Sequence, residues 1–389
     1  MQEVRRHSVW LLVVILISYF VVGFPDGAFT VSWLGIAEDI QGMTTAHTGW
    51  ILVGYSATYT LAGVLLSVIN RYMKLQTIYF WGLIIMGLGF VGLALAPSFA
   101  LVLSAISVYG LGTGAMASSM NSYMAKHFTA RHNNWMHFFW GAGAATSPII
   151  MGQVMATQGW RVGYVVITAV LGLVAIVLLI SMGKKLWISD EISAAQPEKT
   201  PTSGKYLTKK WHEHVQVLTF FFLGGTDYTL VFFMGAALMA RGYDNVAIFP
   251  AVYYLFMTLG RMVAGSVGGR LQEVSIVRAS VLLAAVGIGT LYFTSNIVGM
   301  AITGFGLGPL LPTLVSDTSN AFRPAILPRI VGYELAAFGA GIAVLFFITS
   351  QILHFVSYEA LFPLGLSFVV LVLVCNEVLE HAYQKRILA

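Results

Sequence analysis

Four charged residues interrupt segments that are otherwise almost entirely apolar. Asp26 lies in VVGFPDGAFT, Asp227 in FFLGGTDYTL, Arg261 in TLGRMVAG and Glu334 in GYELA. A charge at the centre of a bilayer costs about 2.5–3.5 kcal/mol on insertion scales, so such residues are usually kept to carry protons, bind solutes or pair with one another. These four side chains are therefore the first candidates for chemistry.

Asp26 and Glu334 are the candidates for proton coupling. Asp26 follows Pro25 and precedes Gly27, which favours a broken helix whose freed backbone groups face a cavity. A carboxylate placed there could exchange a proton with outside water. The alternative is that Asp26 caps a helix segment at the membrane interface. Glu334 could titrate alone or pair with Arg261.

Asp227 stands beside Gly224, Gly225 and Thr226, and it could bind a hydroxylated substrate. Carboxylates accept hydrogen bonds from paired hydroxyls, and such groups suit sugars. The alternative, equally favoured, is a charge pair with Arg261. Arg261 is always protonated and needs a carboxylate or several carbonyls around it, so a structural pairing is its favoured role.

The elements that hold these residues are transmembrane helices. The chain is 58% hydrophobic and 10% charged over 389 residues, far from the roughly 25% charged residues of a soluble domain. Apolar stretches long enough to cross a bilayer recur along the whole chain. They predict an all-α integral membrane protein with twelve spans, near 9–34, 48–69, 76–95, 99–124, 134–156, 162–182, 215–239, 246–268, 275–293, 296–318, 328–353 and 358–379.

The distribution of basic residues predicts the orientation in the membrane. Of the 21 lysines and arginines, eighteen fall on one set of alternate loops and termini, Arg161 and Arg241 fall on the other, and Arg261 lies within a span. The positive-inside rule then places both termini in the cytoplasm, and we expect a multi-pass protein of the cell inner membrane. The lysine-rich stretch 183–214 becomes a cytoplasmic linker whose composition indicates no buried core.

The two halves on either side of this linker share a weak internal similarity. GFPDG at 23–27 corresponds to GGTDY at 224–228, GLGTG at 110–114 to GFGLG at 304–308, and GAG at 141–143 to GAG at 339–341. Three similar offsets indicate one duplication. We therefore predict two pseudo-symmetric six-helix bundles, residues 1–182 and 215–389.

Four stretches carry a family likeness: GLGTGAMASSMNSYMAKHFTARHNNWMHFFWGAGAATSPIIMG at 110–152, FPDGAFTVSW at 24–33, TLGRMVAG at 258–265 and GLGPLLP at 306–312. They resemble the major facilitator superfamily and, within it, the fucose-permease-like branch of sugar–proton symporters. The resemblance implies the major facilitator fold and proton-coupled uptake of a sugar or polyol by alternating access.

Two positions depart from the pattern of that branch. Ala117 replaces an acidic residue four positions before Asn121, and Glu334 stands where glutamine is common. The loop motif that the superfamily carries between the second and third spans survives only as NRYMK at 70–74, with Met73 in place of glycine, and this degeneracy fits the branch. Either Glu334 has taken over the titrating role, or coupling to protons has been lost.

Residues of the resembling segments complete the candidate site. The predicted substrate-binding set is Asp227, Asn121, Tyr55, Trp140 and Tyr333. We assign structural or gating roles to Arg261, His137 and Arg71. The tyrosines and Trp140 could instead be packing or interfacial aromatics, and Asn121 and His137 could equally brace two helices.

Other functional classes are disfavoured. The single cysteine, Cys375, offers no disulfide framework, and the nine histidines show no HExxH or comparable ligand spacing. The glycine-rich GLGTG and GFGLG lie inside spans, where small residues serve helix packing rather than nucleotide binding. We expect no enzymatic activity, no metal or cofactor, no nucleic-acid partner and a monomer that draws energy from the proton gradient. The alternatives are a proton-coupled drug or metabolite exporter, for which Ser147-Pro148 with Gly152 is a partial motif, and a non-transporting membrane receptor.

Overall fold

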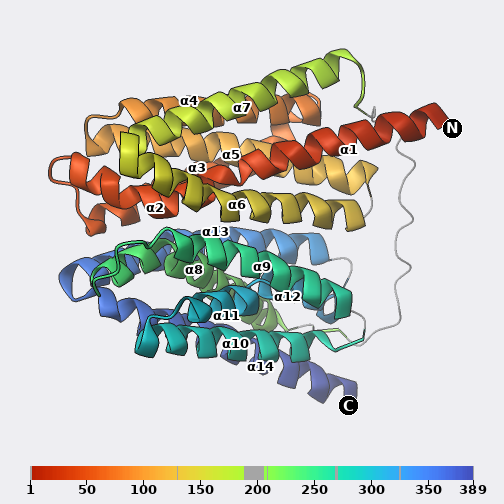
Figure 1. Cartoon of the computed structure of the whole chain (residues 1–389). Coiled ribbons are helices and arrows are strands. Elements are labelled where there is room, and N and C mark those ends of the chain that lie inside the picture. Colours follow the sequence, from red (N-terminus) through yellow and green to blue (C-terminus); the bar gives the residue numbers. More distant parts are fainter. Residues whose placement is uncertain are drawn as a thin grey trace. The chain divides into compact units, whose positions relative to one another are not determined.

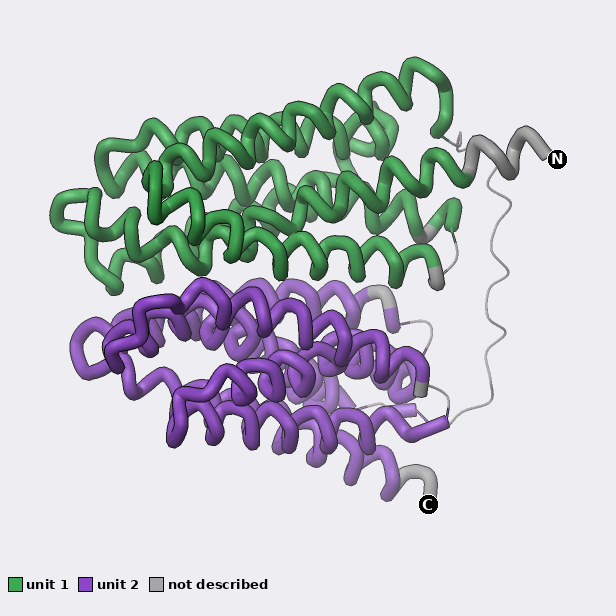
Figure 2. The backbone as a smooth tube through the Cα atoms, viewed as in Figure 1, with its two compact units in different colours: residues 1–197 green, residues 198–389 purple. Residues whose placement is uncertain are grey.

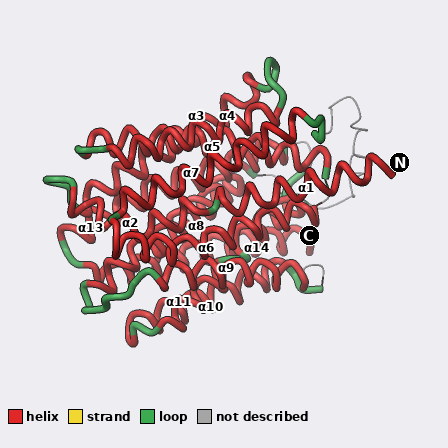
Figure 3. Tube along the Cα trace, turned by 45° about the horizontal axis from the view of Figure 1, so that its top comes forward, coloured by secondary structure: helices red, strands yellow, loops and turns green. Residues whose placement is uncertain are grey.

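The computed structural model describes residues 2–128, 130–187, 206–207, 209–267, 270–323 and 326–388. Within these ranges the regular structure is helical, and an isolated bridge joins Leu207 to Phe322 (Figures 1 and 3). The chain divides into two compact units, residues 1–197 and 198–389, which Figure 2 shows in separate colours. The predicted all-α architecture is confirmed.

The helices of the first unit begin with a broken pair. α1 (Gln2–Val22) and α2 (Phe24–Asp39) meet at Gly23 and together form one apolar stretch. Pro25 lies in the first turn of α2, where its missing N–H leaves no intrahelical bond unmade. The break expected near Pro25 is present, and it places Asp26 in the first turn of α2. The remaining helices are α3 (Thr45–Ile69), α4 (Leu75–Leu95), α5 (Phe99–His127), α6 (Ala130–Gln158) and α7 (Trp160–Gly183).

The second unit contains a break that the sequence analysis missed. The span predicted at 296–318 consists of α11 (Ile297–Leu307) and α12 (Leu310–Ala321), separated by Gly308 and Pro309. Pro309 has no N–H to continue the hydrogen-bond ladder. The other elements are α8 (Lys210–Met239), α9 (Ile248–Val267), α10 (Glu273–Thr294), α13 (Leu327–Phe355), the short 3₁₀ helix η2 (Tyr358–Ala360) and α14 (Leu361–Leu388).

Eleven helical stretches of the described chain are long and apolar enough to cross a membrane. α6, the predicted fifth span, is long enough but more polar, with Asn134, His137 and Gln153 along it. It packs against α1 and α2 within the first unit. His137 and Trp140 form hydrogen bonds inside that unit, so a span of moderate hydropathy suits this position.

The two ends of the predicted linker are more ordered than its composition indicated. Most of the segment 183–214 lies outside the described residues. However, Trp187 is buried and donates from Nε1 to Ser181 Oγ at 2.9 Å. Leu207 is 1% exposed and donates its backbone N–H to the carbonyl of Ala321 at 2.8 Å. At each end of this stretch one apolar side chain is therefore buried against its neighbours. That the stretch forms no buried core of its own stays a prediction.

Glycines bring equivalent helices into backbone contact in both units. A Cβ atom on Gly143 of α6 would lie 1.8 Å from the carbonyl oxygen of Phe20 on α1. A Cβ atom on Gly341 of α13 would lie 1.8 Å from the carbonyl oxygen of Phe221 on α8. These are corresponding positions in the two halves. The duplication inferred from sequence therefore recurs as the same contact in each unit.

Gly143→Ala tests how strongly this contact holds the first unit. Because the new methyl group would overlap a backbone oxygen, α1 and α6 must separate, and we expect at least about 1–3 kcal/mol of destabilisation. The loss should appear as a lower Tm and a smaller yield of monodisperse protein. Gly172→Ala is the matched control, since nothing lies within 4 Å of a Cβ atom there. Equal Tm values for the two variants would contradict the close approach.

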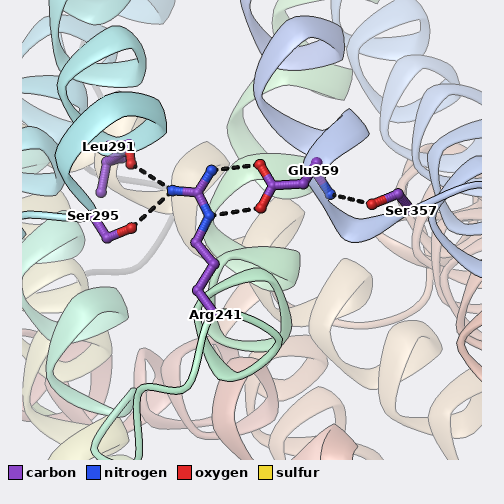
Figure 4. A network of polar contacts seen from close by, with 5 residues as sticks. All are labelled: Arg241, Leu291, Ser295, Ser357 and Glu359. Carbon is purple, nitrogen blue, oxygen red and sulfur yellow. Dashed lines mark hydrogen bonds and ion pairs between the residues drawn. The ribbon is translucent and has the colours of Figure 1, made fainter.

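An ion pair closes one end of the second unit. Arg241, just after α8, donates through Nε and Nη2 to both carboxylate oxygens of Glu359 in η2 (Figure 4). Its Nη1 donates to the carbonyl of Leu291 at 3.0 Å and to Ser295 Oγ at 2.8 Å, at the end of α10. The guanidinium also lies 4.5 Å from the Phe362 ring centroid. Bonding to Glu359 raises the pKa of Arg241, which therefore stays charged.

Arg241→Lys should weaken this end of the unit although the charge is retained. An ammonium group cannot bond both carboxylate oxygens and the α10 carbonyl at once, so we expect a loss of about 1–3 kcal/mol, measured as a lower Tm. Arg278→Lys is the control, because Arg278 makes a similar two-pronged bond to Glu377 but is 52% exposed. If Arg278→Lys lowers Tm as much as Arg241→Lys does, Arg241 has no special role at this end of the unit.

Candidate functional site

The carboxylate of Asp26 is held by two neutral donors in the first unit. Tyr109 Oη on α5 donates to Oδ1 at 3.0 Å, and Trp140 Nε1 on α6 donates to Oδ2 at 3.0 Å. Each oxygen thus accepts one hydrogen bond, and neither donor carries a charge. The arrangement fixes the position of the carboxyl group while leaving its charge uncompensated by these partners.

Further aromatic rings pack against Tyr109, the tyrosine that bonds this carboxyl group. Tyr55 on α3 stacks on Tyr109 with ring centroids 5.1 Å apart, and Phe90 on α4 approaches Tyr109 at 4.7 Å. Tyr59, one turn beyond Tyr55, lies 5.8 Å from it and is partly exposed. Together with Trp140, these residues form a cluster of aromatic rings near the carboxylate of Asp26.

Small residues allow the helices around Asp26 to approach. A Cβ atom on Gly27 would lie 2.1 Å from the carbonyl oxygen of Ala144, so α2 presses on α6 next to Asp26. A Cβ atom on Gly110 would lie 2.5 Å from the carbonyl oxygen of Tyr55, which brings α3 against α5. The glycine of GLGTG therefore serves packing, as expected, and positions the tyrosines of the site.

The corresponding carboxylate of the second unit has a similar environment. Asp227 on α8 accepts a hydrogen bond from the hydroxyl of Tyr253 on α9. Arg261, also on α9, donates from Nε to the carbonyl of Gly308 at 3.1 Å and contacts Met257 Sδ. The two units thus each present an aspartate bonded to a tyrosine hydroxyl.

Glu334 occupies a separate buried cluster at α13. The residue is 0% exposed, and its Oε1 accepts hydrogen bonds from Gln216 Nε2 on α8 at 2.9 Å and from the hydroxyl of Thr318 on α12. Its Oε2 is buried and accepts no hydrogen bond from the described residues. Glu334 also forms no ion pair with any residue that the structure describes. A buried carboxyl group with no cationic partner is most stable with a proton bound.

Arg261 donates from Nε to the carbonyl of Gly308, while Asp227 bonds to Tyr253 and Glu334 bonds to Gln216 and Thr318. The pairing of Arg261 with Asp227 or Glu334 stays a prediction. The carbonyl of Gly308 is available because the residue four positions later is Pro312, which has no N–H to donate to it.

The remaining candidates fall into different places. Asn121 and His137 bond to each other, Oδ1 to Nε2 at 3.1 Å, so they brace α5 against α6. Asn121 Nδ2 also donates to the carbonyl of Ala117 at 2.9 Å. Tyr333 is 52% exposed, and Arg71 is exposed at the loop after α3. Tyr55 and Trp140 are the two predicted binding residues that lie with Asp26.

Sequence reasoning missed three polar partners. Tyr109 was not distinguished from the other tyrosines, and Gln216 and Thr318 were not considered. The sequence does point to Gln216, which lies in the same span as Asp227. An amide side chain inside a span must find a hydrogen-bond partner within the helix bundle. No group of three or more metal-binding side chains occurs among the residues that the structure describes.

Comparison with known proteins gives a consistent classification. The sequence profile of the Major Facilitator Superfamily matches residues 15–333. The methylenomycin A resistance protein of Streptomyces coelicolor is 25% identical over 154 residues, 37% of this chain and 32% of that protein, so the match spans about a third of its length.

Solved transporter structures share the fold at low identity. A peptide transporter POT variant bound to alafosfalin aligns with a TM-score of 0.77 and 12% identity, over 96% of this chain and 94% of that chain. The nucleoside transporter NupG aligns with a TM-score of 0.73 and 11% identity, over 95% of this chain and 99% of that chain. A bacterial homologue of the human lysosomal transporter Spinster aligns with a TM-score of 0.67 and 14% identity, over 98% of this chain and 97% of that chain.

Proposed function

The chain belongs to the Major Facilitator Superfamily, and we propose that it couples proton movement to the transport of a small hydroxylated solute, a sugar or polyol. As a member of this family it is a multi-pass membrane transporter and not an enzyme. The carrying observation is Asp26, whose carboxyl group is held by Tyr109 and Trp140 and forms no ion pair among the residues that the structure describes. Such a group can gain and lose a proton without leaving its position.

The surroundings of Asp26 support a hydroxylated solute. Tyr55, Tyr59 and Trp140 offer flat faces on which the apolar side of a sugar ring can pack, and the carboxylate can accept from hydroxyls. The resemblance to the fucose-permease-like branch supports the same assignment. Asp227 with Tyr253 provides a second carboxylate of this kind in the other unit.

Further parts of this proposal concern orientation and assembly. The excess of lysine and arginine on one set of loops supports a location in the inner membrane with both termini in the cytoplasm. A monomer is part of the proposal. The proton gradient is then its energy source, with no bound cofactor.

A drug or metabolite exporter is the second candidate. The partial match to the methylenomycin A resistance protein favours it, although that match covers 32% of the relative. Aromatic rings beside a carboxylate also suit organic cations, so the same residues serve either reading. A direct ligand comparison separates the two.

The test is a thermal-shift screen on the purified full-length protein. Monosaccharides and polyols are compared with lipophilic cations, and a bound ligand should raise Tm in a concentration-dependent manner. We expect stabilisation by a sugar or polyol that is lost in a Tyr55→Ala variant. Stabilisation by lipophilic cations alone would replace the proposal with the exporter.

A further inference from the structure

A groove runs between the start of α8 and the last turns of α14 in the second unit. It encloses about 850 Å³ and is lined on one side by Lys209, Trp211 and His212 and on the other by residues between Leu373 and Lys385 of α14. The proton-coupling residues proposed above do not line it. The groove is therefore a feature separate from the transport site.

The charge in this groove is positive. Lys209 and Lys385 both line it and are both exposed. Glu377 also lines it, but both of its carboxylate oxygens accept from Arg278, at 2.6 and 2.7 Å, so its charge is balanced. Two lysines are thus left to attract an anion.

The wall of the groove changes from apolar to basic along α14. Val374, Val378 and Ala382 are spaced four residues apart and share one helix face, which ends near Lys385. From Val374 to Lys385 the helix rises roughly 16 Å at 1.5 Å per residue. This stretch belongs to a helix long and apolar enough to cross the membrane. If α14 crosses the membrane along this stretch, its apolar part lies deeper than its basic end at Lys385.

Trp211 marks the interface independently. It is 42% exposed, lines the groove and contacts His212, with ring centroids 4.0 Å apart and ring planes tilted by 56°. His212 in turn accepts from the backbone N–H of Lys209 at 3.2 Å, which fixes the start of α8. Tryptophan is enriched where headgroups meet hydrocarbon.

We propose that this groove binds an anionic phospholipid, with the phosphate at Lys209 and Lys385 and an acyl chain along Val374 and Val378. Two features support this assignment: the lysines match the charge of the phosphate, and the apolar wall matches the acyl chain. A small soluble anion would use the lysines but not the wall. A zwitterionic lipid would use the wall but gain little from the lysines.

Native mass spectrometry of the delipidated full-length protein tests the proposal. Phosphatidylglycerol is compared with phosphatidylcholine of the same chains and with glycerol phosphate. We expect retained phosphatidylglycerol adducts, weakened about thirtyfold by combined Lys209→Ala and Lys385→Ala, as two lysines near a charged surface imply. The matched control is Lys184→Ala with Lys185→Ala, two exposed lysines at the end of α7 that do not line the groove.

A second variant guards against simple loss of folding. Val378→Trp keeps both lysines and fills the apolar wall, and it should also reduce phosphatidylglycerol adducts while Tm without lipid stays unchanged. Equal binding of phosphatidylcholine, equal binding of glycerol phosphate, or undiminished adducts in the lysine variant would each overturn the proposal.

Discussion

Asp26→Asn should abolish accumulation of solute against its gradient, by about a hundredfold or more, while exchange of solute at equilibrium continues. The amide cannot carry the proton, but it keeps the shape of the carboxyl group. Its oxygen can accept from Trp140 Nε1, and its NH₂ can donate to the Tyr109 hydroxyl, which is able to reverse its role. The measurement is uptake into proteoliposomes with and without an imposed proton gradient, set beside counterflow in the same vesicles.

Asp244→Asn provides the control for this experiment, because Asp244 lies exposed in the loop before α9. It should leave both activities intact. Full accumulation by Asp26→Asn would remove Asp26 from the coupling role and leave it as a packing residue. Loss of counterflow as well would mean that Asp26 is needed for binding itself.

Glu334→Gln should flatten the pH dependence of transport. We expect wild-type transport to fall roughly tenfold per pH unit as pH rises through the titration of Glu334, since the protonated form is the neutral one that suits its buried cluster. Glutamine is also neutral, and its oxygen can accept from both Gln216 and Thr318, so folding should be preserved. The rate of solute uptake measured across a range of pH values gives the answer.

Two outcomes of that series would change the proposed mechanism. An unchanged pH profile in Glu334→Gln, with Glu38→Gln as the exposed control, would show that Glu334 has not replaced the acid missing at Ala117. A wild-type protein that is indifferent to the imposed gradient would make facilitated diffusion the better description. The favoured result is a flat profile for Glu334→Gln and a steep one for both wild type and control.

The spans and the break at Asp26 were predictable because their signals are local. Hydropathy marks a helix that must face lipid, and Pro25 between Gly23 and Gly27 marks a place where the helix can be interrupted. α6 shows the limit of this reasoning, since Asn134, His137 and Gln153 lower its hydropathy. Its length and its resemblance to a family pattern, rather than its composition, identified it.

The partners of the charged residues could not be predicted, because they depend on helix rotation and depth. Tyr109 reaches Asp26 across 83 positions and Gln216 reaches Glu334 across 118. An error of one residue in either helix turns a side chain by about 100° around the axis. The carbonyl of Gly308, which accepts from Arg261, could not be identified for the same reason.

The backbone contacts at Gly143 and Gly341 have a consequence for motion. Where one main chain touches another, no side chain can change rotamer to let the helices slide, so α1 with α6, and α8 with α13, must each travel as one body. Amide hydrogens around Phe20 and Phe221 should then exchange with deuterium among the slowest in their units, in the presence or absence of solute. Slow exchange at these two places would identify the helix pairs that move as rigid bodies during the transport cycle.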